Sequence, residues 1–215
     1  MDNSNRPDVR AYIGSTGSGK GVSIRDHLKA VKAKRLLVWD PLDEYGAFCK
    51  LKTRDLAAVA QAMKAPAFTI SYFPGPNAKL YEERFDMFCR LAFAAGDLHM
   101  LVEELSNVTS PSYAPASWQR CTTQGRHRRL RIIAASQRPA QVDKDFFGNC
   151  TYIRCFALRY PADRKAMAGG MNVPLAQLDE LRTIEGDTHV EINWLEADFR
   201  SGKTTPGTKK LPVKR

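Results

Sequence analysis

The chain has 215 residues, of which 43% are hydrophobic and 26% are charged. These values suit one globular α/β domain with a full core. The sequence has no run close to the ~20 apolar residues that cross a bilayer. Its first ten residues, MDNSNRPDVR, also lack the apolar segment of a signal peptide. We therefore expect no direct membrane span and a cytoplasmic location. The five cysteines are scattered without a CxxC pair, so we expect reduced thiols and no metal site.

The formal net charge is +10, and much of it is local. From residue 199 onward the chain contains no acid and six basic residues, namely Arg200, Lys203, Lys209, Lys210, Lys214 and Arg215. Such a segment is suited to bind a polyanion, and nucleic acid is the first candidate. It fits equally well a solvated end that aids solubility. We predict a flexible N-terminus over residues 1–7, an ATPase domain over 8–197 and a flexible basic tail over 198–215.

The hydrophobic pattern alternates short apolar runs with amphipathic segments. This alternation predicts an α/β fold with a mostly parallel sheet and helices on both faces. Strands are expected over residues 9–13, 35–39, 67–73, 98–102, 130–136, 151–156 and 188–193. Helices are expected over residues 19–32, 54–63, 80–95, 117–125, 161–168 and 174–181. Residues 106–116 are rich in proline and serine, which predicts an irregular loop.

The motif GxxxxGK occupies Gly14–Lys20, between the first expected strand and the first expected helix. Glycines let backbone N–H groups point at phosphate oxygens, and the helix N-terminus adds partial positive charge. Lys20 adds a full charge for the β- and γ-phosphates. A seven-residue pattern can arise by chance, but its place between strand and helix argues against that here. The predicted nucleotide-binding residues are Gly14, Ser15, Thr16, Gly17, Ser18, Gly19, Lys20, Gly21 and Val22.

The position after Lys20 departs from the usual motif. A Ser or Thr commonly binds Mg²⁺ there, whereas this chain has Gly21. Ser23 lies two residues further along the helix and so faces another direction. We take Ser23 and an acid elsewhere as candidate metal ligands. Water and phosphate oxygens would complete the coordination. Gly21 weakens the prediction of Mg²⁺ more than the prediction of phosphate binding.

Polar side chains follow two of the expected strands. Glu103 and Glu104 come directly after residues 98–102, and Gln137 comes directly after residues 130–136. Parallel strands deliver their C-terminal residues to the ligand crevice of the sheet. We assign Glu103 to the metal and Glu104 to the attacking water. Gln137 would contact both the γ-phosphate and that water. Alternatively, the glutamates begin a solvated loop and Gln137 belongs to a turn set by Pro139.

The densest internal basic run is QGRHRR, over residues 124–129. Arg126 in this run could reach the nucleotide of a neighbouring subunit as an arginine finger. The run could also contact DNA phosphates, or it could be a solvated helix end where basic residues suit the dipole. Arg120 is a second finger candidate. His99 lies inside an apolar run, and we interpret it as a packed core histidine.

Five segments carry a family resemblance in chain order. They are GSTGSGKG, WDPLDEYG, LHMLVEE, QGRHRRLRIIAASQRP and NCTYIRCFALRYPADR. Together they resemble the HerA/FtsK superfamily of DNA-pumping ATPases, over most of the chain. The resemblance implies a RecA-like P-loop domain, ATP and Mg²⁺ as cofactors, and a homo-hexameric ring with composite sites and an arginine acting in trans. The GKG variant is similar to that of conjugative coupling proteins, so Gly21 need not mean inactivity.

The branch of the superfamily is narrowed by segments that this sequence lacks. Coupling proteins, FtsK and Zot-like proteins carry transmembrane segments, and HerA carries an added barrel. A bare domain is similar to the genome-packaging ATPases of tailless, membrane-containing icosahedral viruses. This similarity implies a motor that moves double-stranded DNA into a preformed capsid, in the host cytoplasm or at a packaging vertex of the virion. Capsid vertex or portal proteins would be its partners.

Two other functions stay open. One is a plasmid-borne or cellular DNA-transfer motor of the same superfamily. The other is a slow nucleotide-dependent switch or structural ring, which Gly21 keeps in consideration. In either motor, residues 74–79 and 106–116 are candidate pore loops by position. Neither loop is strongly basic.

Overall fold

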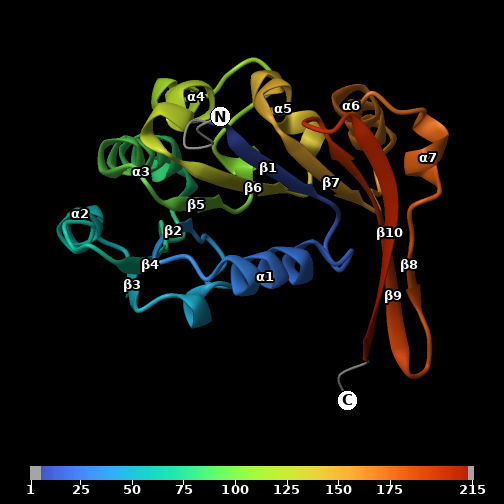
Figure 1. The fold of residues 1–215 in the computed structure, drawn as a ribbon, viewed down its shortest axis with the longest axis horizontal. Coiled ribbons are helices and arrows are strands. Elements are labelled where there is room, and N and C mark those ends of the chain that lie inside the picture. The colour runs from blue at the N-terminus through green and yellow to red at the C-terminus, as the bar shows by residue number, and fades with distance from the viewer. Residues whose placement is uncertain (1–5, 213–215) are drawn as a thin grey trace.

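The computed structural model describes residues 6–212. Its centre is a ten-stranded sheet in the order β10-β9-β7-β1-β6-β5-β2-β4-β3, with β8 paired to β9 (Figure 1). The strands from β7 to β3 in this order are parallel, whereas β8, β9 and β10 pair in antiparallel fashion. The strand bounds are β1 (Asp8–Ile13), β2 (Arg35–Trp39), β3 (Leu51–Thr53), β4 (Phe68–Tyr72), β5 (His99–Val102), β6 (Arg131–Ser136), β7 (Tyr152–Phe156), β8 (Thr183–Glu185), β9 (His189–Asp198) and β10 (Lys203–Pro212).

Helices cover both faces of this sheet, as the alternation of patterns predicted. Helix α1 packs on one face, while the other helices pack on the opposite face (Figure 1). The fold class is therefore the expected P-loop α/β domain. The helix bounds are α1 (Lys20–Val31), α2 (Leu56–Ala62), α3 (Tyr81–Ala95), α4 (Ala116–Gln124), α5 (Lys144–Asn149), α6 (Pro161–Met171) and α7 (Leu175–Asp179).

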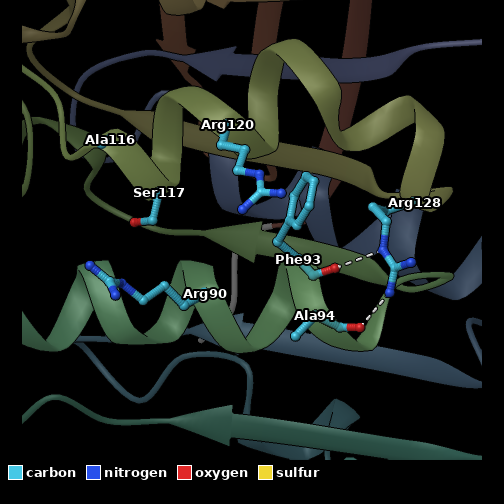
Figure 2. A pocket seen from close by; sticks show the side chains of 7 residues that line it. All are labelled: Arg90, Phe93, Ala94, Ala116, Ser117, Arg120 and Arg128. Carbon is cyan, nitrogen blue, oxygen red and sulfur yellow. Dashed lines mark hydrogen bonds between the residues drawn. The ribbon is translucent and has the colours of Figure 1, made fainter.

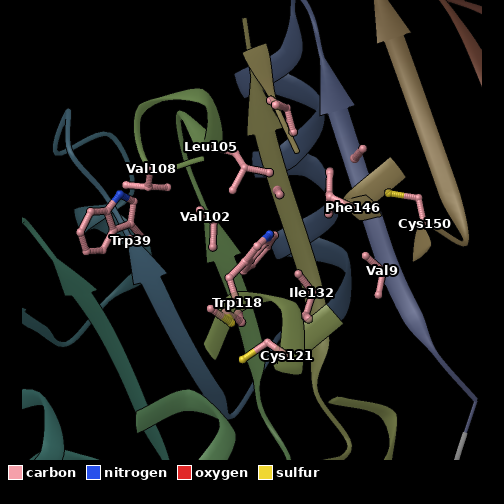
Figure 3. Packing of buried hydrophobic residues seen from close by; sticks show 14 of the residues in the cluster. Val9, Trp39, Val102, Leu105, Val108, Trp118, Cys121, Ile132, Phe146 and Cys150 are labelled. Carbon is pink, nitrogen blue, oxygen red and sulfur yellow. The ribbon is translucent and has the colours of Figure 1, made fainter. Parts of the chain in front are cut away.

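Two apolar clusters flank the sheet because its central strands alternate side chains between the two faces. The larger cluster lies beneath α2–α7, and Figure 3 shows part of it. There the Trp118 ring lies 5.6 Å from the rings of both Phe85 and Phe146. The smaller cluster lies beneath α1. The two clusters hold the strands in register and so fix where the loops at the strand ends lie.

The prediction of a flexible basic tail is wrong for the described part of residues 198–215. Lys203–Pro212 forms β10, which pairs along its whole length with β9. A glycine is needed at position 207, because a Cβ there would lie 2.3 Å from the Trp194 ring. Alternate residues, including Lys209 and Leu211, turn inward, and Lys209 forms an ion pair with Asp26 of α1. The segment is thus an ordered edge strand.

The predicted flexible N-terminus, residues 1–7, is described from Arg6 onward. Residues 1–5 and 213–215 lie outside the described residues. At the inner limit of the N-terminal segment, the Pro7 carbonyl accepts a hydrogen bond from Arg200. Within residues 6–212, no helix combines the length and the apolar character that crossing a membrane requires.

Candidate functional site: a cavity at the phosphate loop

The glycine loop sits at the C-terminal edge of the sheet, held by neighbouring strands. The Gly14 amide donates to the Ser136 carbonyl at 3.1 Å, and the Ser15 amide donates to the Ala157 carbonyl at 3.0 Å. Gly19 has φ 96°, which favours glycine, and α1 begins at Lys20. The loop therefore ends in a helix N-terminus, the arrangement that binds phosphate groups.

A cavity of about 710 Å³ opens beside this loop, a volume usual for small-ligand sites. The residues that line it include most of the predicted site. They are Ser15, Thr16, Gly17, Gly19, Lys20, Gly21, Val22, Arg25, Leu42, Glu44, Glu103, Glu104, Gln137, Val190, Ile192, Leu211 and Pro212. Gly14 and Ser18 belong to the loop but do not line the cavity. Thus β1, β5 and β6 bring Lys20, both glutamates and Gln137 to one place.

Lys20 forms the centre of a buried charge cluster. Its Nζ lies 3.4 Å from Glu104 Oε1 and 3.7 Å from Glu103 Oε2. All three side chains are largely buried. The single ammonium offsets part of the charge of the two carboxylates, because buried charges are tolerated only when they are paired. Lys20 is thus held in the cavity, ready to face a phosphate.

Gln137 joins the glycine loop to Glu104. Its Oε1 accepts a hydrogen bond from the Thr16 hydroxyl, and its Nε2 donates to Glu104 Oε1, both at 2.5 Å. Glu104 has φ 51° and ψ 52°, a left-handed conformation that is costly for a residue other than glycine. The structure keeps this strained backbone where the carboxylate meets both Lys20 and Gln137.

Glu103 is the most deeply buried acid of the cluster, with 4% of its surface exposed. Burial raises the pKa of Glu103, while the Lys20 charge and a hydrogen bond from the Tyr45 hydroxyl act in the lowering direction. The neighbouring Glu104 carboxylate raises that pKa further. Lys20 and Tyr45 therefore help Glu103 stay ionised in a place that disfavours charge.

The loop after β2 places Tyr45, which the sequence analysis did not identify as a site residue. The Asp40 carboxylate accepts hydrogen bonds from the amides of Glu44 and Tyr45, at 2.8 and 3.0 Å, and from the Ser71 hydroxyl at 2.8 Å. This buried Asp fixes the loop so that the Tyr45 phenol reaches Glu103. The signal was present in WDPLDEYG, an acid directly after a buried strand.

A second ion pair that the sequence analysis missed orders the segment after Gln137. The Arg138 Nε lies 2.9 Å from Asp163 Oδ2, and the other Asp163 oxygen accepts from the Ala140 amide at 3.0 Å. Asp163 is fully buried. It ties the end of β6 to α6 and so limits where Gln137 can lie.

The structure does not bring Ser23, the predicted metal ligand, to the cavity with Glu103. Ser23 is buried outside the cavity lining, and its hydroxyl accepts a hydrogen bond from Arg154 at 3.2 Å. Its neighbour Gly21 gives no hydroxyl either, and a Cβ there would lie 3.3 Å from the Arg25 guanidinium. The guanidinium groups of Arg25 and Arg154 thus lie beside the positions where a hydroxyl would bind Mg²⁺.

The remaining acids still fit Mg²⁺ bound to a nucleotide. No group of three or more Asp, Glu, His or Cys side chains that could cage a metal occurs within residues 6–212. Mg²⁺ commonly keeps several waters and uses one or two carboxylates together with substrate phosphates. Glu103 and Glu104, beside Lys20, match that donor set. Free Mg²⁺ is not expected to bind tightly here without phosphate.

The two candidate arginine fingers lie away from this cavity. Arg126 is exposed in a 3-10 turn directly before β6, at the opposite edge of the sheet from Gln137. Six residues of strand separate the two edges by about 20 Å. Arg120, on α4, stacks over Phe93 beside a groove between α3 and α4 (Figure 2). Neither arginine reaches Lys20 of its own chain.

The rest of the basic run has a structural role at one position. Arg128 donates to the carbonyls of Phe93 and Ala94, at 3.0 and 2.5 Å (Figure 2). It therefore binds the carbonyls at the C-terminus of α3, as basic residues commonly do. The two candidate pore loops, residues 74–79 and 106–116, follow β4 and β5 on the same edge as the glycine loop.

Known proteins with the same α/β fold are similar to this chain. No family model matches the chain. Protein P9 of Pseudoalteromonas phage PM2 is 27% identical over 176 residues, which cover 80% of this chain and 78% of P9. The genome packaging NTPase B204 of Sulfolobus turreted icosahedral virus 2, in complex with AMPPCP, has a TM-score of 0.71 at 15% identity and covers 97% of this chain and 98% of its own. The chain has the fold of this viral packaging NTPase.

Two further solved structures share the fold. The DNA-packaging ATPase B204 from Sulfolobus turreted icosahedral virus has a TM-score of 0.67 at 16% identity, over 98% of this chain and 100% of its own. VirB4 of Thermoanaerobacter pseudethanolicus also has a TM-score of 0.67, at 11% identity, over 100% of this chain and 91% of its own. These similarities confirm, at the level of the fold, the resemblance that the order of motifs indicated.

Proposed function

We propose that this protein is an ATP-hydrolysing motor that moves double-stranded viral DNA into a preformed capsid. One observation carries the proposal: Lys20, Glu104 and Gln137 converge in a single cavity beside a phosphate loop. Lys20 supplies a cation for the phosphates, and Glu104 supplies an acid for the attacking water. The Gln137 amide would contact both the γ-phosphate and that water. The fold shared with viral packaging NTPases supports the proposal that this hydrolysis drives DNA packaging.

ATP and Mg²⁺ are the cofactors in this proposal. The loop amides bind the phosphate chain, and Lys20 neutralises the β- and γ-phosphates. Mg²⁺, when bound, supplies further charge neutralisation at these phosphates. Glu103 would hold its coordinated water, and Tyr45 holds the Glu103 carboxylate in place. Ser23 has no part in this arrangement.

Glu104 is the proposed acid that orients and polarises the attacking water. Glu104 accepts hydrogen bonds from both Lys20 and Gln137. A bound γ-phosphate would attract Lys20 and the Gln137 amide, which frees the Glu104 carboxylate for water. Gln137 would thereby register which nucleotide is bound, and its bond to Thr16 would pass that change to the loop.

The site would be completed by a second subunit. Arg126 lies at the sheet edge opposite its own cavity, so it is available to a neighbour's nucleotide in a ring, which we propose is a homo-hexamer. Such a trans arginine can raise the rate ~10³–10⁵-fold. DNA contacts would be mainly to phosphates, because packaging must ignore sequence. Capsid vertex or portal proteins would anchor the ring, in the host cytoplasm and at a packaging vertex of the virion.

The test is DNA-stimulated ATP hydrolysis by the wild type and by Glu104→Gln, under conditions that allow oligomers to form. Loss of a positioned acid–base group lowers rates by about 10²–10⁴-fold. We expect a decrease in kcat of that size with ATP binding retained. Glu83→Gln, on the exposed side of α3, is the matched control and should behave as wild type. Undiminished turnover in Glu104→Gln would overturn the assignment.

Gly21 and Arg25 favour one alternative, a slow nucleotide-dependent switch or structural ring. The loop lacks the hydroxyl that commonly binds Mg²⁺, and a guanidinium lies beside the position. The absence of DNA-stimulated turnover by the wild-type oligomer would select the switch. Uptake of DNA into empty capsid particles would separate a packaging motor from a DNA-transfer motor of the same fold.

A further inference from the structure

The nucleotide cavity has one apolar wall, built by the β9–β10 hairpin. Val190 and Ile192 of β9, and Leu211 and Pro212 of β10, line it. Val190 and Leu211 are directly paired across the two strands, so their side chains share one face of the hairpin. All four side chains are without hydrogen-bonding groups. This wall is made from the segment that the sequence analysis took partly for a flexible tail.

The wall is fixed relative to the phosphate loop by several contacts. Ile192 packs on the loop itself, since a Cβ on Gly19 would lie 2.3 Å from the Ile192 Cδ1. Lys209 of β10 forms an ion pair with Asp26 of α1. In addition, β9 pairs with β7, which runs beside β1, the strand that leads into the loop. The hairpin therefore belongs to the same rigid frame as Lys20.

The direction of a bound nucleotide follows from the charged end of the cavity. In the proposed function, Lys20, Glu104 and Gln137 surround the terminal phosphate. The phosphate chain then runs over the N-terminus of α1, where Gly21 and Val22 line the same cavity. The nucleoside would lie beyond them, away from Glu103 and Glu104, where the hairpin offers an apolar surface.

We propose that the hairpin wall of Val190, Ile192, Leu211 and Pro212 seats the nucleoside base, and that it accepts several bases with little discrimination. This inference rests on the proposed function. An apolar surface gains affinity by burying the base, whereas strong selection between bases needs polar groups that match their hydrogen-bonding edges, and the four side chains of the wall carry none. Two polar side chains of the lining outside the phosphate end, Arg25 and Glu44, stand on α1 and on the loop after β2, not on the wall.

The experiment measures equilibrium binding of ATP, GTP, CTP and inorganic tripolyphosphate, by displacement of a fluorescent ATP analogue. Tripolyphosphate reports the phosphate loop without a nucleoside. For the wild type we expect the four ligands to bind, with the three nucleotides within about 100-fold of one another. A preference above about 1,000-fold for one base would overturn the claim of weak discrimination.

Leu211→Ala and Val190→Ser test the wall itself. Each should weaken ATP binding about 3- to 10-fold through lost apolar contact, while tripolyphosphate binding stays unchanged. Unchanged tripolyphosphate binding also shows that each variant is folded. Ile184→Ala, exposed on β8 outside the cavity, is the matched control and should bind ATP as the wild type does.

Three contrary outcomes have different meanings. Unaltered ATP binding in both wall variants would overturn the inference and leave the phosphate site intact. Failure of the wild type to bind tripolyphosphate and ATP would overturn the proposed function and the inference with it. A parallel loss of tripolyphosphate and ATP binding in the wall variants would show that the hairpin only supports the loop.

Discussion

Tyr45→Phe tests whether the ionised form of Glu103 supports the reaction. The buried Tyr45 hydroxyl donates a hydrogen bond to the Glu103 carboxylate, which has a pKa raised by burial. This hydrogen bond lowers the pKa of Glu103. Its removal should raise the pKa of Glu103 further, because Lys20 then remains as the principal group that favours the charged form.

The size of the effect follows from the strength of such bonds. A hydrogen bond to a charged group contributes roughly 1.5–3 kcal/mol, and one pKa unit corresponds to about 1.4 kcal/mol. The pKa of Glu103 should therefore rise by about 1–2 units. A carboxylate is ionised above its pKa, so the rate is lost as the pH falls through it. The acid limb of the profile moves to higher pH in the variant.

The assay is the pH dependence of kcat/KM for ATP hydrolysis, which reports ionisations of the free enzyme. Tyr152→Phe is the matched control, because its phenol donates to Glu196 at 2.6 Å, outside the cavity. The control should leave the acid limb in place. An acid limb of Tyr45→Phe that coincides with the wild type would show that Glu103 ionisation does not limit the reaction.

Two further predictions concern binding and stability. Lys20→Ala should abolish ATP binding, measured by calorimetry, while circular dichroism shows the fold retained; intact affinity would contradict the site assignment. Burial, with the nearby Arg131 charge, lowers the pKa of His99 to about 4, so protons bind the unfolded chain first as the pH falls from 6.5 towards 4. The stability lost in that window is at most about 3.4 kcal/mol and about 1–2 kcal/mol after allowance for partial exposure. Urea midpoints at pH 7 and 4.5 should show a smaller acid loss in His99→Gln, and an equal loss would assign the effect to other groups.

The parts of the site that the sequence predicted depend on local patterns. GxxxxGK needs only the strand before it and the helix after it, and both are short-range features. Glu103 and Gln137 were placed correctly because each directly follows a run of apolar residues. In a parallel sheet the ends of such strands meet at one edge whatever their order. The shared cavity could thus be inferred without knowing that β5 and β6 are neighbours.

The parts that were missed depend on contacts between distant segments. Tyr45 reaches Glu103 only because β2 pairs with β5 in a register that sets Trp39 opposite Val102. No periodicity in the sequence specifies that register. Ser23 was assigned to the metal from its spacing alone, whereas the Arg154 side chain on β7 determines what its hydroxyl faces.

The edge strand β10 was missed for a different reason. Its sequence, KTTPGTKKLP, is polar and contains Pro206 and Gly207, which are uncommon within strands. An edge strand tolerates such residues because one side of its backbone needs no partner. Its order comes from β9, from Trp194 packed on Gly207 and from the Lys209–Asp26 pair. The basic charge of this segment led to the prediction of a flexible tail. Pairing with β9 instead makes the segment a strand.

In the proposed ring, β6 would connect the nucleotide site of its own subunit with that of a neighbouring subunit. This strand begins after the basic run that contains Arg126 and ends directly before Gln137. Its hydrogen bonds to β1 and β5 on either side make it a stiff element. In the ring, Arg126 would contact a neighbour's phosphate while Gln137 contacts the phosphate of its own chain. A shift of the strand caused by hydrolysis at one end would alter side-chain geometry at the other. Because Gln137 also holds Thr16 and Glu104, that shift would reach both the loop and the acid that orients water.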